Sequence, residues 1–400
     1  MIKALLFDLD DTLLANDMAT FLPAYFQGVT RHFPERAAGQ MIQDLMTGTR
    51  AMLANTDPTR MLRPVFLDNF PLLAVDPVTV WERFEAFYGT DFTELRALTT
   101  PRPAARYVLE WAVAAGYQVV VATSPLFPLA AIQERLHWAD VAGLPFDLIT
   151  HIENCHFAKP HPEYFAEILA RLGVRPDEAL MVGNDWSDDL VPAAQLGLPH
   201  YWIAPPGTPP PAGAPLAAPL GVGRLEDFLA WAPANLPALR PPAPPAASIP
   251  YQLAGHLAYL YSELDGLPDG SWSRRPAETE WSLAEIACHL RDVDAEVNLP
   301  RARAVLTTDN PFVSGIDSDA WAVERQYQAQ SGPSALADFA QARRALCALL
   351  AAQPAPAWQR PARHAFFGPT TLAEIMGLAL DHDRIHLTQT RDTLRKVRRG

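Results

Sequence analysis

The stretch ALLFDLDDTLL, residues 4–14, decides the fold of the first half of the chain. It is a short apolar run, typical of a buried strand, that leads directly into Asp8 and Asp10. Side chains two positions apart on a strand point to the same side, so the two carboxylates face one space. One carboxylate of such a pair can attack phosphorus or bind a metal while the other moves protons. Because Asp-x-Asp is also common in turns, the pair alone does not decide the function.

Four further short apolar runs predict strands at residues 117–124, 145–150, 179–185 and 199–204. Helical segments lie between them, and the stretch before residue 100 is mainly helical. This alternation is typical of a doubly wound parallel α/β sheet, in which ligands bind at the carboxyl ends of the strands. We therefore expect the polar residues at those ends, Asp8, Thr123 and Asn184 among them, to meet at one edge.

The motifs follow the order of a known family, the haloacid dehalogenase-like hydrolase superfamily, which residues 1–232 resemble. DLDDTL (8–13) resembles its first motif, Thr123 its second, Lys159 in HFAKPHPEYF its third, and VGNDWSDDL (182–190) its acidic fourth motif. The resemblance implies that Asp8 attacks phosphorus to form an aspartyl-phosphate and that Asp10 is the general acid and base. It also implies that Thr123 and Lys159 neutralise the phosphoryl oxygens.

The same resemblance implies a Mg²⁺ ion held by Asp8, the backbone carbonyl of Asp10 and the fourth-motif loop. The family pattern has an aspartate where this chain has Asn184, whose amide oxygen brings no charge. Asp185 or Asp189 then has to supply the charge. The sequence leaves open which of these three side chains contacts the cation.

Residues 15–100 are long enough to form a helical cap over this site. They contain no lysine, which argues against the Schiff-base chemistry of phosphonate-cleaving relatives. The second acid, Asp10, favours phosphoryl transfer over dehalogenation. Four cap residues are candidates for reading a substrate, although a packing or solvated role is the commoner one for such side chains: Tyr25, Arg50, Arg60 and Arg63.

The segment between the two halves is rich in proline, with 14 of the chain's 39 prolines at residues 205–250. Proline-rich chain cannot continue a helix or a central strand, so we predict a semi-rigid linker at 233–249. Residues 250–400 then show helical patterns and no convincing strand, with capping boxes at 282–285 and 371–374. They predict an all-α four-helix bundle.

Three histidines in the bundle form a candidate metal site. His382 and His386 are four apart on the last helix and share one face, and His289 lies mid-helix among apolar residues. Neutral imidazoles on facing helices can bind Zn²⁺, Ni²⁺ or another divalent ion. Asp381 and Asp383 are candidates to orient the imidazoles, or they are simply solvated.

The segments WSLAEIACHLRDVDAEV and DHDRIHLTQ resemble helices of the DinB-like superfamily, and the resemblance covers about 250–395. It implies that His289, His382 and His386 are the metal ligands. Relatives include thiol-dependent transferases and metal-dependent hydrolases, so the bundle is either a second enzyme or a binding or dimerisation module. It could also form a homodimer.

Composition excludes some classes of function. The net charge of −13 argues against nucleic-acid binding, and no apolar run is long enough to cross a membrane. The three cysteines are far apart, which favours a reducing cytoplasm over a disulfide framework. The sequence therefore predicts a cytoplasmic Mg²⁺-dependent phosphatase for a small phosphorylated metabolite, fused to a metal-binding bundle. In the alternatives, the bundle is the main enzyme, or it is non-catalytic.

Overall fold

The computed structural model describes residues 1–71, 76–215 and 218–399. The chain divides into two compact units, Met1–Ile168 with Val174–Ala243 and Leu169–Gly173 with Pro244–Gly400. Residues 72–75 of the expected cap and Gly400 of the expected bundle lie outside the described residues. The domain boundaries drawn from the proline content stay a prediction. In the described ranges, no helix combines the length and apolarity needed to cross a membrane.

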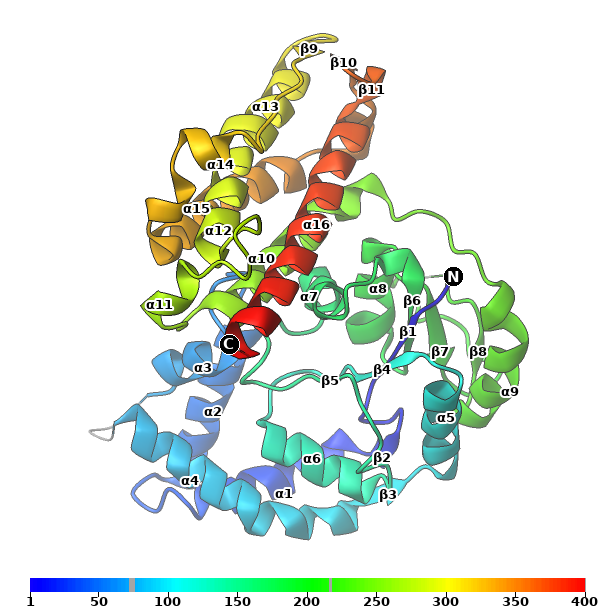
Figure 1. Cartoon of the computed structure of the whole chain (residues 1–400). Helices are drawn as coiled ribbons and strands as arrows, with labels where there is room; N and C mark the ends of the chain where they lie inside the picture. Colours follow the sequence, from blue (N-terminus) through cyan, green and yellow to red (C-terminus); the bar gives the residue numbers. More distant parts are fainter. Residues whose placement is uncertain (72–75, 216–217, 400) are drawn as a thin grey trace. The chain divides into compact units, whose positions relative to one another are not determined.

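The first unit contains a six-stranded sheet in the order β5–β4–β1–β6–β7–β8, with every neighbouring pair parallel (Figure 1). All four residues of β1 are fully buried, as expected for a strand with neighbours on both edges and helices on both faces. The predicted doubly wound fold is confirmed. The strands are β1 (Ala4–Phe7), β4 (Gln118–Val121), β5 (Leu148–Ile149), β6 (Ala179–Gly183), β7 (His200–Ile203) and β8 (Val222–Gly223).

Three short strands of this unit were not predicted from the sequence. β8 adds an outer strand to the sheet, and β2 (Leu14–Asn16) pairs antiparallel with β3 (Thr99–Pro101). Strands of two or three residues are too short to show an alternating pattern. The β2–β3 pair brings the two ends of the cap together.

Helices fill the rest of the first unit. The cap is helical as expected, and Asp17 and Asp76 cap two of its helices by accepting hydrogen bonds from backbone N–H groups of the first turn. Its helices are α1 (Met18–Thr30), α2 (Ala38–Leu53), α3 (Leu62–Asn69), α4 (Pro77–Gly89) and η1 (Asp91–Leu98). The sheet carries α5 (Pro103–Ala114), α6 (Leu129–Trp138), α7 (Pro162–Leu172), η2 (Pro176–Glu178), η3 (Trp186–Leu190), α8 (Val191–Leu196) and α9 (Leu225–Asn235).

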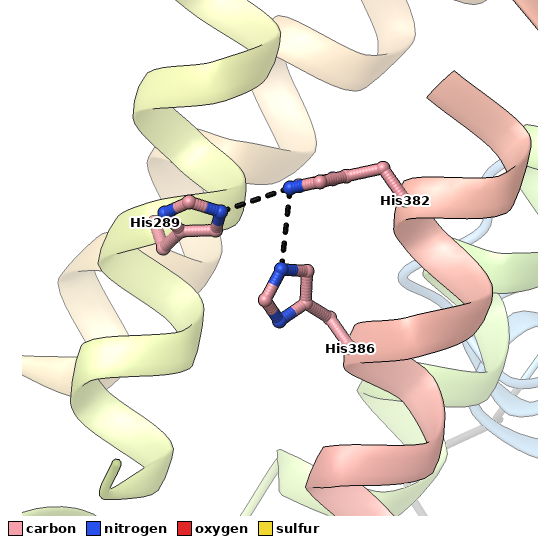
Figure 2. A group of neighbouring side chains, drawn as sticks. All are labelled: His289, His382 and His386. Atoms are coloured by element: carbon pink, nitrogen blue, oxygen red, sulfur yellow. Dashed lines mark hydrogen bonds between the residues drawn. The ribbon is translucent and has the colours of Figure 1, made fainter. Parts of the chain in front are cut away.

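The second unit is built on the four expected helices. Both predicted capping boxes form, with Ser282 and Glu285 at one helix start and Thr371 and Glu374 at the other. α12 and α16 pack against each other and carry the histidines (Figure 2). The four helices are α10 (Ile249–Leu264), α12 (Leu283–Val293), α15 (Gly332–Ala351) and α16 (Leu372–Arg399). Shorter segments are η5 (Ala246–Ser248), α11 (Asp269–Trp272), η6 (Asp294–Asn298), α13 (Leu299–Thr307), α14 (Trp321–Glu324), η7 (Tyr327–Ala329) and η8 (Ala355–Gln359).

The expectation that the second unit lacks strands is wrong. β9 (Phe312–Val313), β10 (Pro361–His364) and β11 (Gly368–Thr371) form a three-stranded sheet, β9 parallel and β11 antiparallel to β10. These strands are short and interrupted by proline, so their sequence reads as loop. His364 lies at the end of β10.

Candidate active site and metal centre

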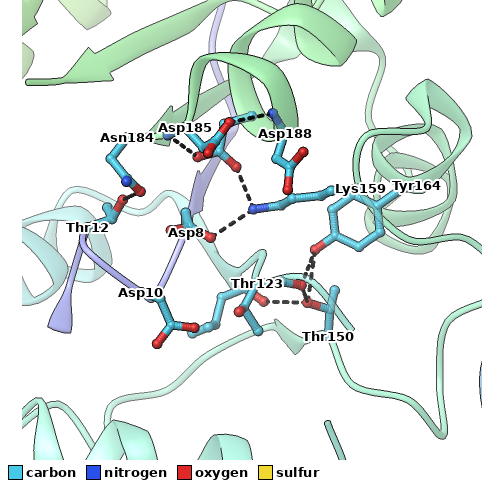
Figure 3. A network of polar contacts seen from close by, with 12 residues as sticks. Asp8, Asp10, Thr12, Thr123, Thr150, Lys159, Tyr164, Asn184, Asp185 and Asp188 are labelled. Carbon is cyan, nitrogen blue, oxygen red and sulfur yellow. Dashed lines mark hydrogen bonds and ion pairs between the residues drawn. The ribbon is translucent and has the colours of Figure 1, made fainter. Parts of the chain in front are cut away.

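Asp8 lies at the carboxyl end of the central strand. Phe7 pairs with Val121 of β4 and Val182 of β6, so Asp8 follows at the level where both neighbouring strands end. Its side chain is nearly buried, and Lys159 Nζ donates a hydrogen bond of 2.8 Å to Asp8 Oδ1. The same ammonium, shown beside Asp8 in Figure 3, also donates to Asp189 Oδ1 at 2.5 Å. One buried cation therefore holds the first and the fourth motif together.

The charges at this edge are set by burial and by one another. Burial raises the pKa of Asp8 to about 7, against the opposing effect of Lys159. Burial also raises the pKa of Asp189. Burial alone would lower the pKa of Lys159, but the two carboxylates outweigh it and raise that pKa above its ordinary value. Lys159 is therefore a permanent ammonium, the form that can neutralise a phosphoryl oxygen.

Asp10 has two partners that the sequence did not indicate. Arg135 Nη1 on α6 donates to Asp10 Oδ2 at 2.6 Å, and Asn16 Nδ2 donates to Asp10 Oδ1 at 2.8 Å. The Arg135 side chain is almost completely buried, and its guanidinium lies 4.6 Å from the centre of the Phe127 ring. Both carboxylate oxygens of Asp10 thus accept a hydrogen bond. No motif places an arginine 125 positions away beside this acid.

Thr123 is buried just beyond the end of β4. Its backbone carbonyl accepts hydrogen bonds of 2.8 Å from Thr150 Oγ1 and from Tyr164 Oη (Figure 3). Thr150 and Tyr164 also lie 2.9 Å apart through their hydroxyls. This network fixes the backbone of the second motif next to Lys159, whose ammonium lies 6.0 Å from the Tyr164 ring centre.

The oxygens of Asp8, Asp10 and Asn184 converge on one point. A terminal atom of the Asn184 amide lies 3.0 Å from the carbonyl oxygen of Asp10, 3.3 Å from Asp8 Oδ2 and 3.0 Å from Thr12 Oγ1. An amide nitrogen at this position donates to these oxygens, whereas an amide oxygen there accepts from Thr12 Oγ1 and faces the oxygens of Asp8 and Asp10. Neighbouring oxygens around an octahedral Mg²⁺ are about 2.9 Å apart, so the spacing fits such an ion.

The other acids of the fourth motif have local roles. Asp185 Oδ1 accepts 2.8 Å hydrogen bonds from the backbone N–H groups of Ser187 and Asp188 and so caps η3. Asp189 uses Oδ1 for Lys159 and accepts from the backbone of Asp185 through Oδ2 at 3.0 Å. Asn184 is thus a fourth-motif side chain in direct contact with oxygens of Asp8 and Asp10. Burial raises the pKa of Asp188.

The three bundle histidines meet in the second unit. His289 Nε2 lies 2.9 Å and His386 Nε2 lies 3.2 Å from His382 Nε2 (Figure 2). The ligand nitrogens of all three fall within 4.8 Å of one another. Two nitrogen ligands of a tetrahedral Zn²⁺ are about 3.3 Å apart, so the cluster has the spacing of a metal site.

The protonation of these imidazoles also suits a metal. Burial, together with the neighbouring histidines, lowers the pKa of His289 to about 3 and that of His386 to about 4. His386 Nδ1 lies 2.8 Å from Gln389 Oε1, which can only accept, so the proton of the neutral ring is on Nδ1. Its Nε2 is then unprotonated, with a lone pair that points to the other imidazoles of the cluster, as a metal ligand requires.

Comparison with known families gives each unit a relative. Residues 2–197 match the family model of the haloacid dehalogenase-like hydrolases, and residues 252–390 match that of the DinB superfamily. The chain joins a haloacid dehalogenase-like hydrolase to a DinB-superfamily domain. Both predicted resemblances are confirmed, and the protein is a hydrolase.

Relatives of the hydrolase domain include phosphatases. A glyceraldehyde 3-phosphate phosphatase of Pyrococcus furiosus is 26% identical over 220 residues, which are 50% of this chain and 80% of that protein. The pyrophosphatase PpaX of Anoxybacillus flavithermus is 24% identical over 190 residues, 47% of this chain and 78% of that protein. A HAD phosphatase structure from Thermococcus onnurineus matches with a TM-score of 0.37 and 22% identity, over 57% of this chain and 96% of that one.

In the DinB-superfamily domain, the expected aspartates do not orient the histidines. Asp381 pairs with Arg384 on the surface, and Asp383 turns to a buried arginine, Arg343. Arg343 also binds Asp294, and neither this arginine nor its cluster was predicted from the sequence. A lone arginine in a helical pattern normally reads as exposed, and only the fold brings two acids to it.

The three cap arginines of the hydrolase domain contact other residues of the cap. Arg60 pairs with Asp68, Arg63 lies over the ring of Trp81 at 4.2 Å, and Arg50 Nε donates to a backbone carbonyl of its own helix. Tyr25 differs, because it is buried and lines an apolar cavity.

Proposed function

We propose that the hydrolase domain is a divalent-metal-dependent phosphatase that cleaves a small phosphate monoester through an aspartyl-phosphate on Asp8. The observation that carries the proposal is the buried ammonium of Lys159 between Asp8 and Asp189, next to converging oxygens of Asp8, Asp10 and Asn184. A phosphoryl group bound there meets a nucleophile, a fixed cation and a metal cradle. The glyceraldehyde 3-phosphate phosphatase relative is named for hydrolysis of a monoester, and the pyrophosphatase relative supports hydrolysis at phosphorus more generally.

In this proposal Asp8 attacks phosphorus, and the bond to the leaving oxygen breaks as the aspartyl-phosphate forms. Asp10 gives its proton to the leaving alkoxide and then takes one from the water that hydrolyses the acyl phosphate. Lys159 and Thr123 hold the equatorial oxygens. Both oxygens of Asp10 accept hydrogen bonds here, so Asp10 has to turn away from Arg135 to reach the leaving group.

We propose that Asp8, the carbonyl of Asp10 and Asn184 hold Mg²⁺. The ion would supply positive charge opposite the phosphoryl oxygens. Asp185 and Asp189 remain candidates for indirect contacts with the ion. They could contact it through a water molecule or position the loop that carries Asn184.

The cap suggests which organic group the ester carries. A cavity of about 280 Å³ lies between α1, α2, α4 and the loop that follows Ser124. Its wall is aromatic and aliphatic and includes Phe26, Trp81 and Phe127, with no charged side chain among the described lining residues. We propose that an uncharged, largely apolar leaving group occupies it. The hydroxyls of Tyr25 and Tyr88, 2.9 Å apart in its wall, share one hydrogen and leave another for an acceptor oxygen of the substrate.

The test is phosphate release with Mg²⁺ from a panel of monoesters that runs from glyceraldehyde 3-phosphate to alkyl and aryl phosphates. We expect turnover that chelation and Asp8→Asn abolish, and that the exposed loop variant Asp140→Asn leaves unchanged. Turnover in Asp8→Asn would refute the nucleophile. A higher kcat/KM for the polar esters would refute the assignment of the cavity while leaving the phosphatase proposal intact.

We propose that His289, His382 and His386 bind Zn²⁺, Ni²⁺ or a similar ion in the DinB-superfamily domain. Metal content of the intact protein, compared with His382→Ala, tests this directly. An enzymatic activity of the full chain that survives Asp8→Asn but is lost in His289→Ala would show that the bundle is the main enzyme. A bundle that holds metal without any activity would favour a binding or dimerisation module. The expected homodimer and the cytoplasmic compartment stay predictions.

A further inference from the structure

His382 lines a second feature of the DinB-superfamily domain, a cavity of about 250 Å³. Its wall comes from η6, α13, the loop before α14, the β10–β11 hairpin and the first half of α16. Most wall side chains are apolar, among them Val297 and Leu378. Phe366 and Phe367, at the hairpin turn, are 77% and 64% exposed, so a ligand in the cavity would remove large aromatic surface from water.

Four polar side chains besides His382 line this cavity, and two of them, Arg301 and His364, are donors; the others are Asn298 and Ser318. Arg301 lines it, and one of its five N–H groups donates to the carbonyl of Ser314 at 2.6 Å. Within the described chain, Arg301 forms no ion pair, and none of the lining residues is acidic. A half-buried guanidinium without a carboxylate is costly, because burial removes its water without supplying a counter-charge.

His364 offers a second donor. The backbone N–H of Phe366 donates to His364 Nδ1 at 3.2 Å, so the neutral ring carries its proton on Nε2. Burial, with Arg301 nearby, lowers the pKa of His364 and keeps this ring neutral. His382 Nδ1 is shielded from solvent and has no hydrogen-bond partner among the described residues. The cavity therefore combines largely apolar walls with a guanidinium that has no counter-charge and an imidazole N–H donor.

We propose that this cavity binds an organic carboxylate with an aromatic or branched apolar body. The guanidinium of Arg301 and the Nε2–H of His364 hold the carboxylate, and Phe366 and Phe367 cover the apolar body. A planar carboxylate matches the fork of the guanidinium and takes two parallel hydrogen bonds from it. The site goes beyond the proposed metal centre, and it places the ligand next to His382.

The experiment is isothermal titration calorimetry of the full chain with benzoate, phenylacetate and 4-methylvalerate. The amides of the same acids are the uncharged controls, and phenyl phosphate is the competing anion. We expect saturable binding of at least one carboxylate and about 10- to 150-fold weaker binding of its amide, the loss that corresponds to one charge-assisted interaction. Arg301→Gln should weaken carboxylate binding by a similar factor. Arg303→Gln, an exposed change on the same helix, should leave it unaltered.

His364→Gln, which keeps a donor, should weaken binding less than Arg301→Gln does. Thermal unfolding of each variant separates a lost contact from a lost fold. The proposal is overturned if no carboxylate binds saturably, if an amide binds as well as its acid, or if Arg301→Gln and Arg303→Gln behave alike. Displacement of the bound carboxylate by phenyl phosphate, at a lower concentration than any competing carboxylate requires, would assign this site to a phosphate and also overturn the proposal.

Discussion

Replacing Arg343 by methionine should strongly destabilise the DinB-superfamily domain. The guanidinium is completely buried, and all five of its N–H groups have an acceptor. Asp294 receives two hydrogen bonds (2.5 and 3.2 Å), Asp383 receives two (2.5 and 2.9 Å), and the carbonyl of Leu253 receives one (3.2 Å). His256 Nδ1 lies 3.0 Å from Asp383 as well. The cluster therefore ties α10, α15, α16 and η6 together through one cation.

The size of the stability loss follows from the two acids that Arg343→Met would leave buried without a counter-charge. Burial acts to raise the pKa of Asp383, but Arg343 and His256 outweigh it and lower that pKa below its usual range. Burial raises the pKa of Asp294. Removing one partner of a buried ion pair costs about 3–5 kcal/mol. For a domain of this size that loss lowers the melting temperature by about 6–20 °C.

Differential scanning calorimetry of the full chain gives the melting temperature. Hydrogen exchange locates the loss, which should appear in α10, α15 and α16 and leave the peptides of the hydrolase sheet unchanged. Arg344→Met, an exposed change at the next position of the same helix, is the matched control and should shift stability by less than about 0.5 kcal/mol.

A compensating variant tests the physical reason. Changing Asp294 and Asp383 to leucine together with Arg343→Met removes every charge of the cluster and should regain most of the lost stability, because buried ion pairs can be replaced by apolar side chains. A loss below about 1 kcal/mol for Arg343→Met would refute the argument that this cation offsets two buried charges. No recovery in the compensated variant would show that shape, and not charge, is what Arg343 supplies.

Three further predictions concern the hydrolase domain. Asn184→Asp adds a negative charge to the proposed metal cradle, so the Mg²⁺ concentration at half-maximal phosphate release should fall about fivefold, for about 1 kcal/mol of added attraction; an unchanged value would remove Asn184 from the cradle. Arg135→Met should lower kcat by up to about 10²-fold with little change in KM, because it loosens Asp10 without touching the phosphoryl site. Burial lowers the pKa of His200, which stays neutral in the fold while the unfolded chain takes up a proton. His200 should therefore contribute a stability loss of up to about 1.4 kcal/mol per pH unit below about pH 6.5. Calorimetry measures this contribution as the difference in pH dependence between the wild type and His200→Leu, because the raised pKa of Asp8 acts in the opposite direction in both proteins.

The sequence could place several residues of the proposed hydrolase site because they follow strand ends. Asp8, Thr123 and Asn184 come from segments far apart in the chain, and parallel strands bring their carboxyl ends to one edge. The histidines were predictable for a similar reason, since helical spacing puts His382 and His386 on one face. Strand and helix periodicity therefore predicts those residues of each site that regular backbone geometry brings together.

What the sequence does not reveal depends on packing between elements. Arg135 reaches Asp10 from a helix that no motif marks, and Arg343 finds its two acids only when four helical segments have assembled. The three-stranded sheet that places His364 has strands of two to four residues, below the length at which a pattern shows. Contacts of this kind have no signature along the chain.

The two proposed metal centres offer different donor atoms and therefore favour different ions. The hydrolase cradle offers only oxygen, and the carboxylate of Asp8 brings charge, which suits a hard cation such as Mg²⁺. The bundle offers three nitrogens, and its low imidazole pKa values, about 3 for His289 and about 4 for His386, leave the lone pairs unprotonated at neutral pH. Such a site favours Zn²⁺ or Ni²⁺ over Mg²⁺. One chain can therefore hold two different ions, since each donor set selects its own ion.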